Sequence, residues 1–481
     1  MRVRGAAGTV VLMTLLGCAG IPPKPRPVVL PSEAPFSEQN VTHGQWPREQ
    51  WWRAYRDPSL DQLIDLALTF SPSLGVAQAR FESARQSVRI AASESGAHVD
   101  VNGSFERQRL SDNGLFPPRL LGFNWYNQAD LGLKASYNFD WWGKQRDSLA
   151  SAMDEAHAAQ ADHAASELVL ASSVADTYFG WQADQSRLAL NRERLVLLQR
   201  TAAIDAARER AELESADILH RSDADLAALR EQIAVLDASA RLRVVTLAAL
   251  LGKSVSELPV LEVKPLPAIV AGLPERVRVD LMARRPDITA SRWRVEATEK
   301  NLNVARAVFF PDVSLNALIG LSSLRLAKLL EAGSGVSLAG AAIRVPLFDG
   351  GRLQARYSAS QALVTAAVAS YRETLVNAAR EVSMLVETRM QIGVQQTQRL
   401  IALDAAQRLR ESAAARVRQG IADSRTELAA IDSWLLQREG LMQLNAAAIS
   451  ADIGLQRALG GGYESTQQTA ISTPLSMTAA P

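Results

Sequence analysis

The sequence is poor in several residue types, and each shortage excludes a class of structure. It has one cysteine, Cys18, among 481 residues, so no disulfide can form within the chain. Aromatic residues make up only 6% of the sequence, which favours long helices over a large globular core. The formal net charge is +1, so no nucleic-acid partner is expected. Beyond the N-terminal region no apolar run reaches about 20 residues, so we expect no helical membrane span.

Residue patterns for catalysis and for metal binding are also missing. Five histidines are scattered along the chain. His157 and His163 are six positions apart, a spacing that does not place both on one face of a helix as a metal pair requires. The serines lack the context of a nucleophile elbow, and no phosphate-binding loop is found. We therefore infer no enzyme, no metal and no cofactor.

The N-terminus has the pattern of an export signal. Arg2 and Arg4 precede an apolar run at 10–16, and the sequence LLGC at 15–18 is similar to a bacterial lipobox. We predict a lipoprotein signal peptide at 1–17 and lipidation of Cys18, the alternative being a short signal peptide with an incidental cysteine.

Two further segments are predicted to lack a fold of their own. Residues 18–56 begin with a proline-rich stretch and are expected to form a lipid-anchored tether. The tail at 463–481 is rich in Ser, Thr, Gln and Ala and is expected to be disordered.

Proline is absent from two long stretches, which indicates an internal duplication. The first stretch lies between Pro118 and Pro259 and the second between Pro346 and Pro474. Their glycines keep an offset of 208 residues, and each stretch follows two segments of alternating polarity. We predict two repeats, at 57–260 and 261–462. Their long helical hairpins are expected at about 143–251 and 350–459.

The alternating segments are predicted to be β-strands at about 98–109, 126–140, 312–322 and 336–347. Asp130, Lys134 and Arg344 fall on the polar side of this alternation. The length suits tilted membrane strands, although a sandwich with one buried face gives the same alternation. Four strands cannot close a membrane barrel, so several chains must share one; two copies would supply eight strands and three would supply twelve.

The helical stretches are too long for a compact domain. A continuous helix of some 70 residues would reach roughly 100 Å. Leu226, Leu229, Ile233 and Leu236 step by three and four, as in a supercoiled seam. Such helices suit a closed ring of helices, and a soluble coiled-coil rod is the alternative.

Each long stretch must turn once at a tip. In the second repeat we predict the turn at 416–424, where Gly420 can adopt a left-handed conformation and Asp423 or Ser424 can cap the next helix. In the first repeat Glu212 takes the place of Gly420. We therefore expect the two turns to differ.

Six short motifs together carry a resemblance to a known family. They are WW at 51–52, DPSLD at 57–61, RPDI at 285–288, AVFFP at 307–311, PLFDGGR at 346–352, and the tip segment at 418–430. With them the chain resembles the outer-membrane efflux proteins, which are TolC-like, and most closely the NodT-type outer-membrane lipoproteins of tripartite RND efflux systems.

The resemblance implies a homotrimer with a twelve-stranded barrel in the outer membrane and a twelve-helix tunnel in the periplasm. A mixed equatorial region would include 60–68 and 273–283. Ala19 after the cysteine fits delivery to the outer membrane. The implied partners are a periplasmic adaptor and an inner-membrane RND pump, which would expel small molecules through a passive duct gated at its tip. The alternatives are a type I protein-secretion duct and a lipid-anchored coiled coil without a pore.

The family often has an aspartate ring nine residues after the tip glycine, where this chain has Ala429. We predict that Asp423 or Asp432 closes the pore instead, paired with Arg416 or Arg418 across a neighbouring helix. Solvated charges at an exposed helical turn are the simpler alternative.

Overall fold

The computed structural model describes residues 21–31, 46–113, 117–269 and 284–464. The chain divides into two compact units, the first formed by Met1–Leu30, Phe81–Ala158 and Ser291–Tyr371, the second by Pro31–Arg80, Ala159–Ala290 and Arg372–Pro481. Each unit therefore contains parts of both sequence repeats. Among the described residues, no helix combines the length and the apolar character needed to cross a membrane.

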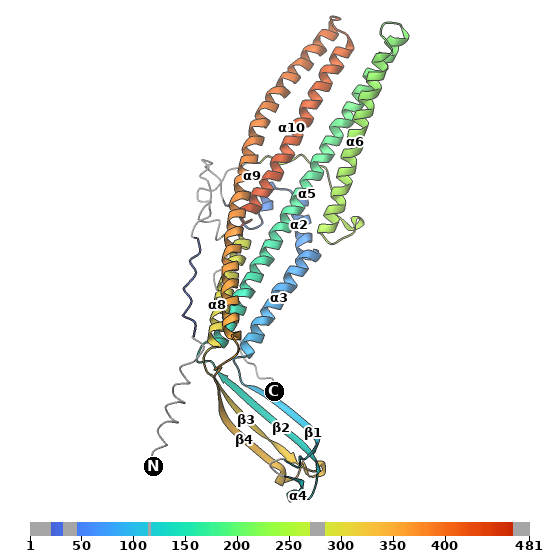
Figure 1. Ribbon diagram of the computed structural model, residues 1–481. Helices are drawn as coiled ribbons and strands as arrows, with labels where there is room; N and C mark the ends of the chain where they lie inside the picture. The colour runs from blue at the N-terminus through green and yellow to red at the C-terminus, as the bar shows by residue number, and fades with distance from the viewer. Residues whose placement is uncertain (1–20, 32–45, 114–116, 270–283, 465–481) are drawn as a thin grey trace. The chain divides into compact units, whose positions relative to one another are not determined.

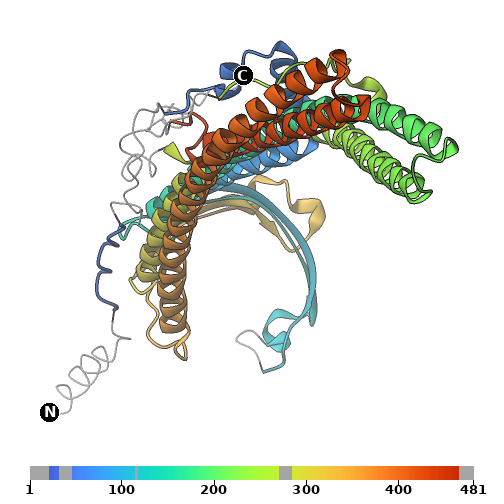
Figure 2. The same cartoon turned by 90° about the horizontal axis from the view of Figure 1, so that it is seen from above.

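The first unit contains one antiparallel sheet in the order β1-β2-β3-β4. Its strands are β1 His98–Arg109, β2 Trp125–Phe139, β3 Asp312–Ser323 and β4 Gly335–Arg344. β2 pairs with β3, so the sheet joins the two repeats, and it forms a curved, open layer (Figures 1 and 2). β4 ends before Pro346, which has no N–H to donate to the ladder.

The two faces of the sheet differ in polarity. Large apolar side chains on one face are exposed in the single chain, including Val101 at 70%, Ile319 at 65% and Ile343 at 70%. Residues directly opposite each other in a pair of strands share a face. The register of the strand pairs therefore places Asp130, Lys134 and Arg344 together on the other face.

The helices follow the predicted duplication. α5 (Lys144–Arg210) and α9 (Arg352–Arg418) each have 67 residues, which corresponds to about 100 Å. α5 is followed by α6 (Asp217–Leu250) and α9 by α10 (Ser424–Ala458), giving two helical hairpins (Figure 1). The shorter elements are η2 Trp51–Tyr55, α2 Pro58–Phe70, α3 Pro72–Ser93, α4 Pro118–Leu121, η3 Val255–Glu257, α8 Pro286–Ala307, η4 Leu326–Lys328 and η5 Ala332–Ser334. The predicted fold class, with four strands and duplicated helical hairpins in each chain, is confirmed.

The second unit holds a core in which the N-terminal part packs on the long helices. Its apolar cluster includes residues of η2, α2, α5, α6 and α10. Next to it Asp57 caps α2 by accepting the backbone N–H of Ser59 at 3.0 Å. Burial raises the pKa of Asp57, but hydrogen bonds from Tyr178 at 2.7 Å and Lys264 at 2.9 Å outweigh it and hold this pKa below its usual value. Asp57 therefore connects the start of α2 with α5, through Tyr178, and with the segment that contains Lys264.

The two tip turns share one left-handed backbone conformation, although we expected them to differ because the first turn lacks the glycine. Glu212 has φ 58° and Gly420 has φ 72°, both in the left-handed region. The following residue in each repeat, Leu213 or Ile421, donates its N–H to a carbonyl five residues earlier. The turns do differ in the next helix, because Asp423 caps α10 whereas no side chain caps α6 at Ala216.

Replacing Glu212 by glycine should stabilise the first tip turn. A non-glycine residue in the left-handed region costs about 1 kcal/mol, and glycine removes this cost at the expense of a more flexible unfolded chain. We expect Glu212→Gly to slow amide hydrogen exchange in the turn by up to several-fold. Gly420→Ala is the matched reverse change and should accelerate exchange in the second turn. Faster exchange in Glu212→Gly would contradict this interpretation.

Candidate functional site at the helical tips

Five charged residues connect the ends of the two helical hairpins, and we name them the tip cluster. The first hairpin supplies three of them and the second hairpin supplies two. They are Asp205, Arg208, Glu214, Asp423 and Arg425. All five belong to the second compact unit. The cluster therefore bridges the two sequence repeats at the turns where their long helices end.

Arg425 is the centre of the tip cluster. Its Nη1 lies 3.4 Å from Asp205 Oδ1 and 3.2 Å from Glu214 Oε1, both on the first hairpin. Its Nε lies 3.1 Å from Asp423 Oδ2 on its own hairpin. Arg208 makes the reciprocal connection, with Nη2 3.4 Å from Glu214 and Nη1 3.6 Å from Asp423. Each hairpin thus sends one arginine to carboxylates of the other.

The electrostatics of the tip cluster favour its charged state. Hydrogen bonds from the backbone and side chain of Arg425 hold the pKa of Asp423 below its usual value. The hydrogen bond to Asp423 in turn raises the pKa of Arg425. The Arg425 side chain is 29% exposed and that of Asp423 is 39% exposed, so salt will screen these pairs. Arg425 and Asp423 therefore form a charged contact that ionic strength can weaken.

Two more ion pairs connect the same two hairpins further from the tip. Arg194 of α5 holds Asp432 of α10 with two contacts, at 2.9 and 3.4 Å. Arg187 lies 3.1 Å from Glu439, which also accepts a hydrogen bond from Gln232 of α6 at 3.0 Å. On each helix the two residues are one heptad apart, so both pairs lie along one seam.

Apolar side chains fill the same seam between the ion pairs. Leu190 and Leu197 of α5 are buried in one cluster with Leu435 of α10. The two leucines of α5 are also one heptad apart, so leucines and arginines follow the same helical stripe. The seam is therefore a short coiled coil between α5 and α10, with ion pairs beside its apolar contacts.

The structure brings together only part of the predicted tip site. Gly420 forms the turn, and Ser424 begins α10 and donates its hydroxyl to Asp423 at 3.1 Å. Arg416 and Arg418 lie in the last turn of α9 and form no ion pair with any described residue. The intrachain partners of the two predicted acids are instead arginines of α5 and α10.

The sequence interpretation missed Arg194, Arg208 and Arg425. The sequence did contain a pattern for the residues of the second hairpin that form these ion pairs. Arg425, Asp432 and Glu439 are spaced by seven residues, which places them on one face of α10. This pattern was not recognised because the heptad spacing alone does not say which helix lies opposite.

Several predicted features lie outside the described residues. They include the signal peptide at 1–17, Cys18, the equatorial segment at 273–283 and most of the tail at 463–481.

Comparison with known proteins identifies the family. The model of the outer membrane efflux protein family matches residues 63–253 and 277–461. The chain is 30% identical over 426 residues to the multidrug resistance outer membrane protein MdtP of Escherichia coli strain K12, covering 87% of each chain. It is 29% identical over 473 residues to the multidrug resistance outer membrane protein MdtQ of Escherichia coli O157:H7, covering 94% of this chain and 97% of MdtQ. The crystal structure of the outer membrane protein VceC of Vibrio cholerae matches with a TM-score of 0.78 at 31% identity, covering 87% of this chain and 100% of VceC. The chain belongs to the outer membrane efflux protein family. The resemblance found in the sequence is thereby confirmed, and the location of this efflux protein is the outer membrane.

In this efflux protein, Arg194 and Asp432 should be strongly coupled. Their side chains are only 11% and 23% exposed, so removing one partner leaves the other charge poorly solvated. We expect a double-mutant cycle with Arg194→Met and Asp432→Asn to give a coupling of about 1–2 kcal/mol by chemical denaturation of the detergent-purified protein.

The exposed pair Arg408 and Asp404, at 77% and 61% exposure within α9, is the matched control. Its coupling should stay below about 0.5 kcal/mol. Equal coupling in the two cycles would show that the Arg194 contact adds nothing to the seam.

Proposed function

We propose that the protein is the outer-membrane duct of a tripartite pump that expels small molecules, and that three copies form one channel. The family supports the efflux role, and two relatives are named multidrug resistance proteins. The chain has no phosphate-binding loop in its sequence. A periplasmic adaptor and an inner-membrane RND pump are therefore proposed as partners, with the pump supplying the energy.

The observation that carries this proposal is the four-stranded sheet. Its outer strands β1 and β4 are each paired on one side only within the described chain. In lipid every unpaired backbone group costs several kcal/mol, so both edges need partners. Pairing β1 of one copy with β4 of the next provides them and closes a barrel. The apolar face then contacts lipid, and the face with Asp130, Lys134 and Arg344 lines the lumen.

The tip cluster is proposed to keep the duct closed. A channel lined by four helices from each copy widens at its end only if the hairpins separate. Separating α9 and α10 from α5 and α6 breaks the contacts of Arg425 with Asp205 and Glu214, and those of Arg208 with Asp423. Docking of an adaptor at the tip would supply the free energy to break them.

Removing the two arginines of the tip cluster should open the channel. We expect the double variant Arg208→Met with Arg425→Met to raise single-channel conductance in planar bilayers by roughly threefold or more, because the carboxylates of the cluster then repel one another.

High salt should raise the conductance of the unmodified protein beyond the increase in bulk conductivity, and this excess should disappear in the variant.

The control is Arg408→Met together with Arg241→Met. Each of these arginines pairs with an aspartate four residues earlier on its own helix, so no contact between hairpins is lost. Their conductance should equal that of the unmodified protein. A tip variant that stays in the low-conductance state would rule out the cluster as the lock, and a chain that never conducts would exclude the duct itself.

The segment after the cysteine supports a lipid anchor near the sheet. Residues 21–30 run along the helices of the first unit, where Val28 N–H donates to Glu299 at 2.9 Å. Arg306 donates to the Pro22 carbonyl at 2.9 Å, and the Tyr357 hydroxyl donates to the Pro23 carbonyl at 3.4 Å. These contacts hold the chain close to the starts of β3 and α9. We propose that Cys18 is acylated in the adjacent membrane leaflet.

Mass spectrometry of the intact protein tests the lipid anchor. We expect the native chain to begin at Cys18 and to carry acyl chains, and Cys18→Ala to lack them. Because the barrel provides its own membrane contact, the variant should still conduct in bilayers. A native protein without added acyl mass would contradict the lipidation.

A further inference from the structure

A pocket of about 250 Å³ lies in the first unit at one end of the sheet. Here β2 and β4 end, β3 begins, and both long helices α5 and α9 start. Three basic side chains line the pocket: Lys144, Arg344 and Arg352. Lys144 and Arg352 occupy equivalent places in the two repeats, 208 residues apart. The duplication therefore places a base at the start of each long helix, and Arg344 adds a third.

The carboxylates near the pocket are largely committed to backbone groups. Asp140 accepts the N–H groups of Gln145 at 3.0 Å and Arg146 at 2.9 Å and so caps α5. Asp349 accepts the N–H of Leu353 at 2.8 Å and so caps α9, and it lies 3.9 Å from Arg352. Their charges are partly balanced by the helix ends they cap. The helix N-termini, with about +0.5 charge each, therefore balance part of the negative charge of these two acids.

Two of the three bases have no acidic partner. Among the described residues, neither Lys144 nor Arg344 forms an ion pair, although Arg344 lies directly opposite Asp312 in the β3–β4 register. All three basic side chains are exposed. The three bases are matched by three carboxylates, those of Asp140, Asp312 and Asp349, while the N-termini of α5 and α9 add partial positive charge, so the potential in the pocket is modestly positive and a small anion is stabilised there.

Two aromatic residues of the pocket lining fix its geometry. Trp142 stacks on Phe310 with ring centroids 4.5 Å apart and an interplanar angle of 17°. The indole N–H of Trp142 also donates to the Pro311 carbonyl at 2.8 Å. These contacts hold the β2–α5 connection against the α8–β3 connection, so the bases extend from a fixed frame.

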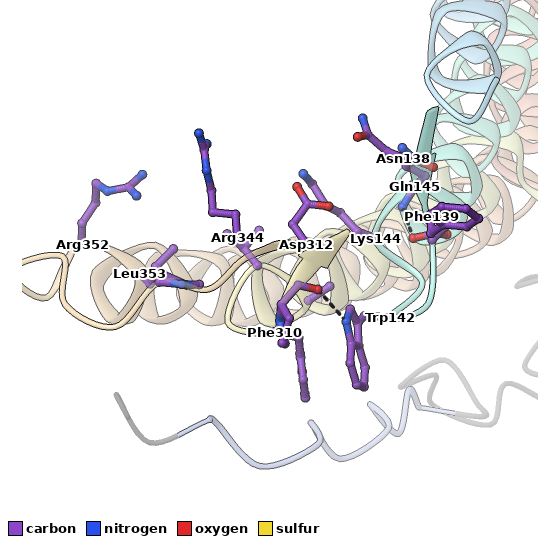
Figure 3. Close-up of a pocket in the computed structure, with 15 residues that line it drawn as sticks. Asn138, Phe139, Trp142, Lys144, Gln145, Phe310, Asp312, Arg344, Arg352 and Leu353 are labelled. Carbon is purple, nitrogen blue, oxygen red and sulfur yellow. Dashed lines mark hydrogen bonds between the residues drawn. The ribbon is translucent and has the colours of Figure 1, made fainter. Parts of the chain in front are cut away.

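The bases and the aromatic pair lie on different sides of this frame. Arg344 and Arg352 point to one side, while Trp142 and Phe310 point to the opposite side (Figure 3). Arg344 belongs to the polar face of the sheet, which lines the lumen in the proposed barrel. The acyl chains of a lipid would pack on the two aromatic rings, which point away from Arg344 and Arg352. The geometry therefore favours a ligand inside the duct.

We infer that this pocket is an anion-binding station in the duct, which attracts export substrates carrying a carboxylate, sulfonate or phosphate group. The inference rests on the proposed function, because the pocket lines a lumen only when the barrel is closed. Three copies would place nine bases in a ring at this level. Binding is weak, since a conducting site must release its ligand.

Ion selectivity measures the station directly. In planar bilayers under a KCl gradient, the tip-open protein with Arg208→Met and Arg425→Met should favour chloride over potassium. Adding Lys144→Gln, Arg344→Gln and Arg352→Gln should lower the anion-to-cation permeability ratio by roughly threefold or more. Benzenesulfonate should reduce the current of the first protein in a concentration-dependent manner and should lose this effect in the second.

The matched control is Arg107→Gln in the tip-open protein. Arg107 stacks on Trp125 at 5.4 Å and lies on the face of β1 opposite to the polar face, so its loss should leave the ratio unchanged. Bilayers with and without phosphatidylglycerol distinguish an anion in the duct from a lipid headgroup. If the selectivity depends on this lipid and on Arg344, the bases bind a headgroup and the station is overturned. An unchanged ratio in the Gln variant, with conductance retained, would also overturn it. Absence of conductance in every variant would instead refute the duct and the station with it.

Discussion

The requirement that backbone groups be paired in lipid governs the rest of this structure. One chain supplies four strands, with unpaired groups along β1 and β4 and with exposed apolar side chains on one face. Neither feature is tolerable for a separate chain, because the edges need hydrogen bonds and the apolar face needs a nonpolar solvent. Association of copies around a common axis meets the first need, and insertion into a membrane meets the second. The proposed gate at the tip and the proposed selectivity of the duct both require that the copies form a closed barrel.

The duplication has a physical consequence for the same sheet. Each repeat contributes one hairpin of strands, and the β2–β3 pairing joins the two hairpins in an unbroken register from Ala129 opposite Ser323 to Phe139 opposite Val313. An isolated hairpin is marginally stable, whereas four strands connected in this way form one surface. Each hairpin is then continued by a helix of 67 residues, α5 or α9. Equal helix lengths bring both turns to corresponding positions, and at these turns Arg425 meets Asp205.

Features that depend on the periodicity of one segment could be predicted from the sequence. Features that depend on which helices pack together could not. Alternation located the strands, and the 208-residue offset located both hairpins, because these patterns are properties of single segments. The proposed gate role of Asp423 and Asp432 stays a prediction, and their intrachain partners Arg208 and Arg194 depend on which face of α5 packs on α10. No pattern within one helix contains that information. Glu212 is a similar case: its left-handed backbone follows from the repeat it occupies, against the preference of its own side chain.

Most side chains of the ion pairs between the hairpins are less exposed away from the tip, and in the proposed gate this difference favours opening at the tip. Four of the five side chains of the tip cluster are 29–39% exposed, the exception being Asp205 at 5%, whereas the four side chains of the deeper pairs are 8–23% exposed. Water and salt can replace partners at the exposed end at little cost, while separation of the deeper pairs leaves charges poorly solvated. The leucines packed beside Arg194 add an apolar contact that the tip lacks. In the proposed gate, separation that starts at the tip therefore meets a higher cost at Arg194, which lies two heptads, or about four helical turns, from Arg208 along α5. In the proposed gate, the seam therefore confines the movement to the ends of the hairpins.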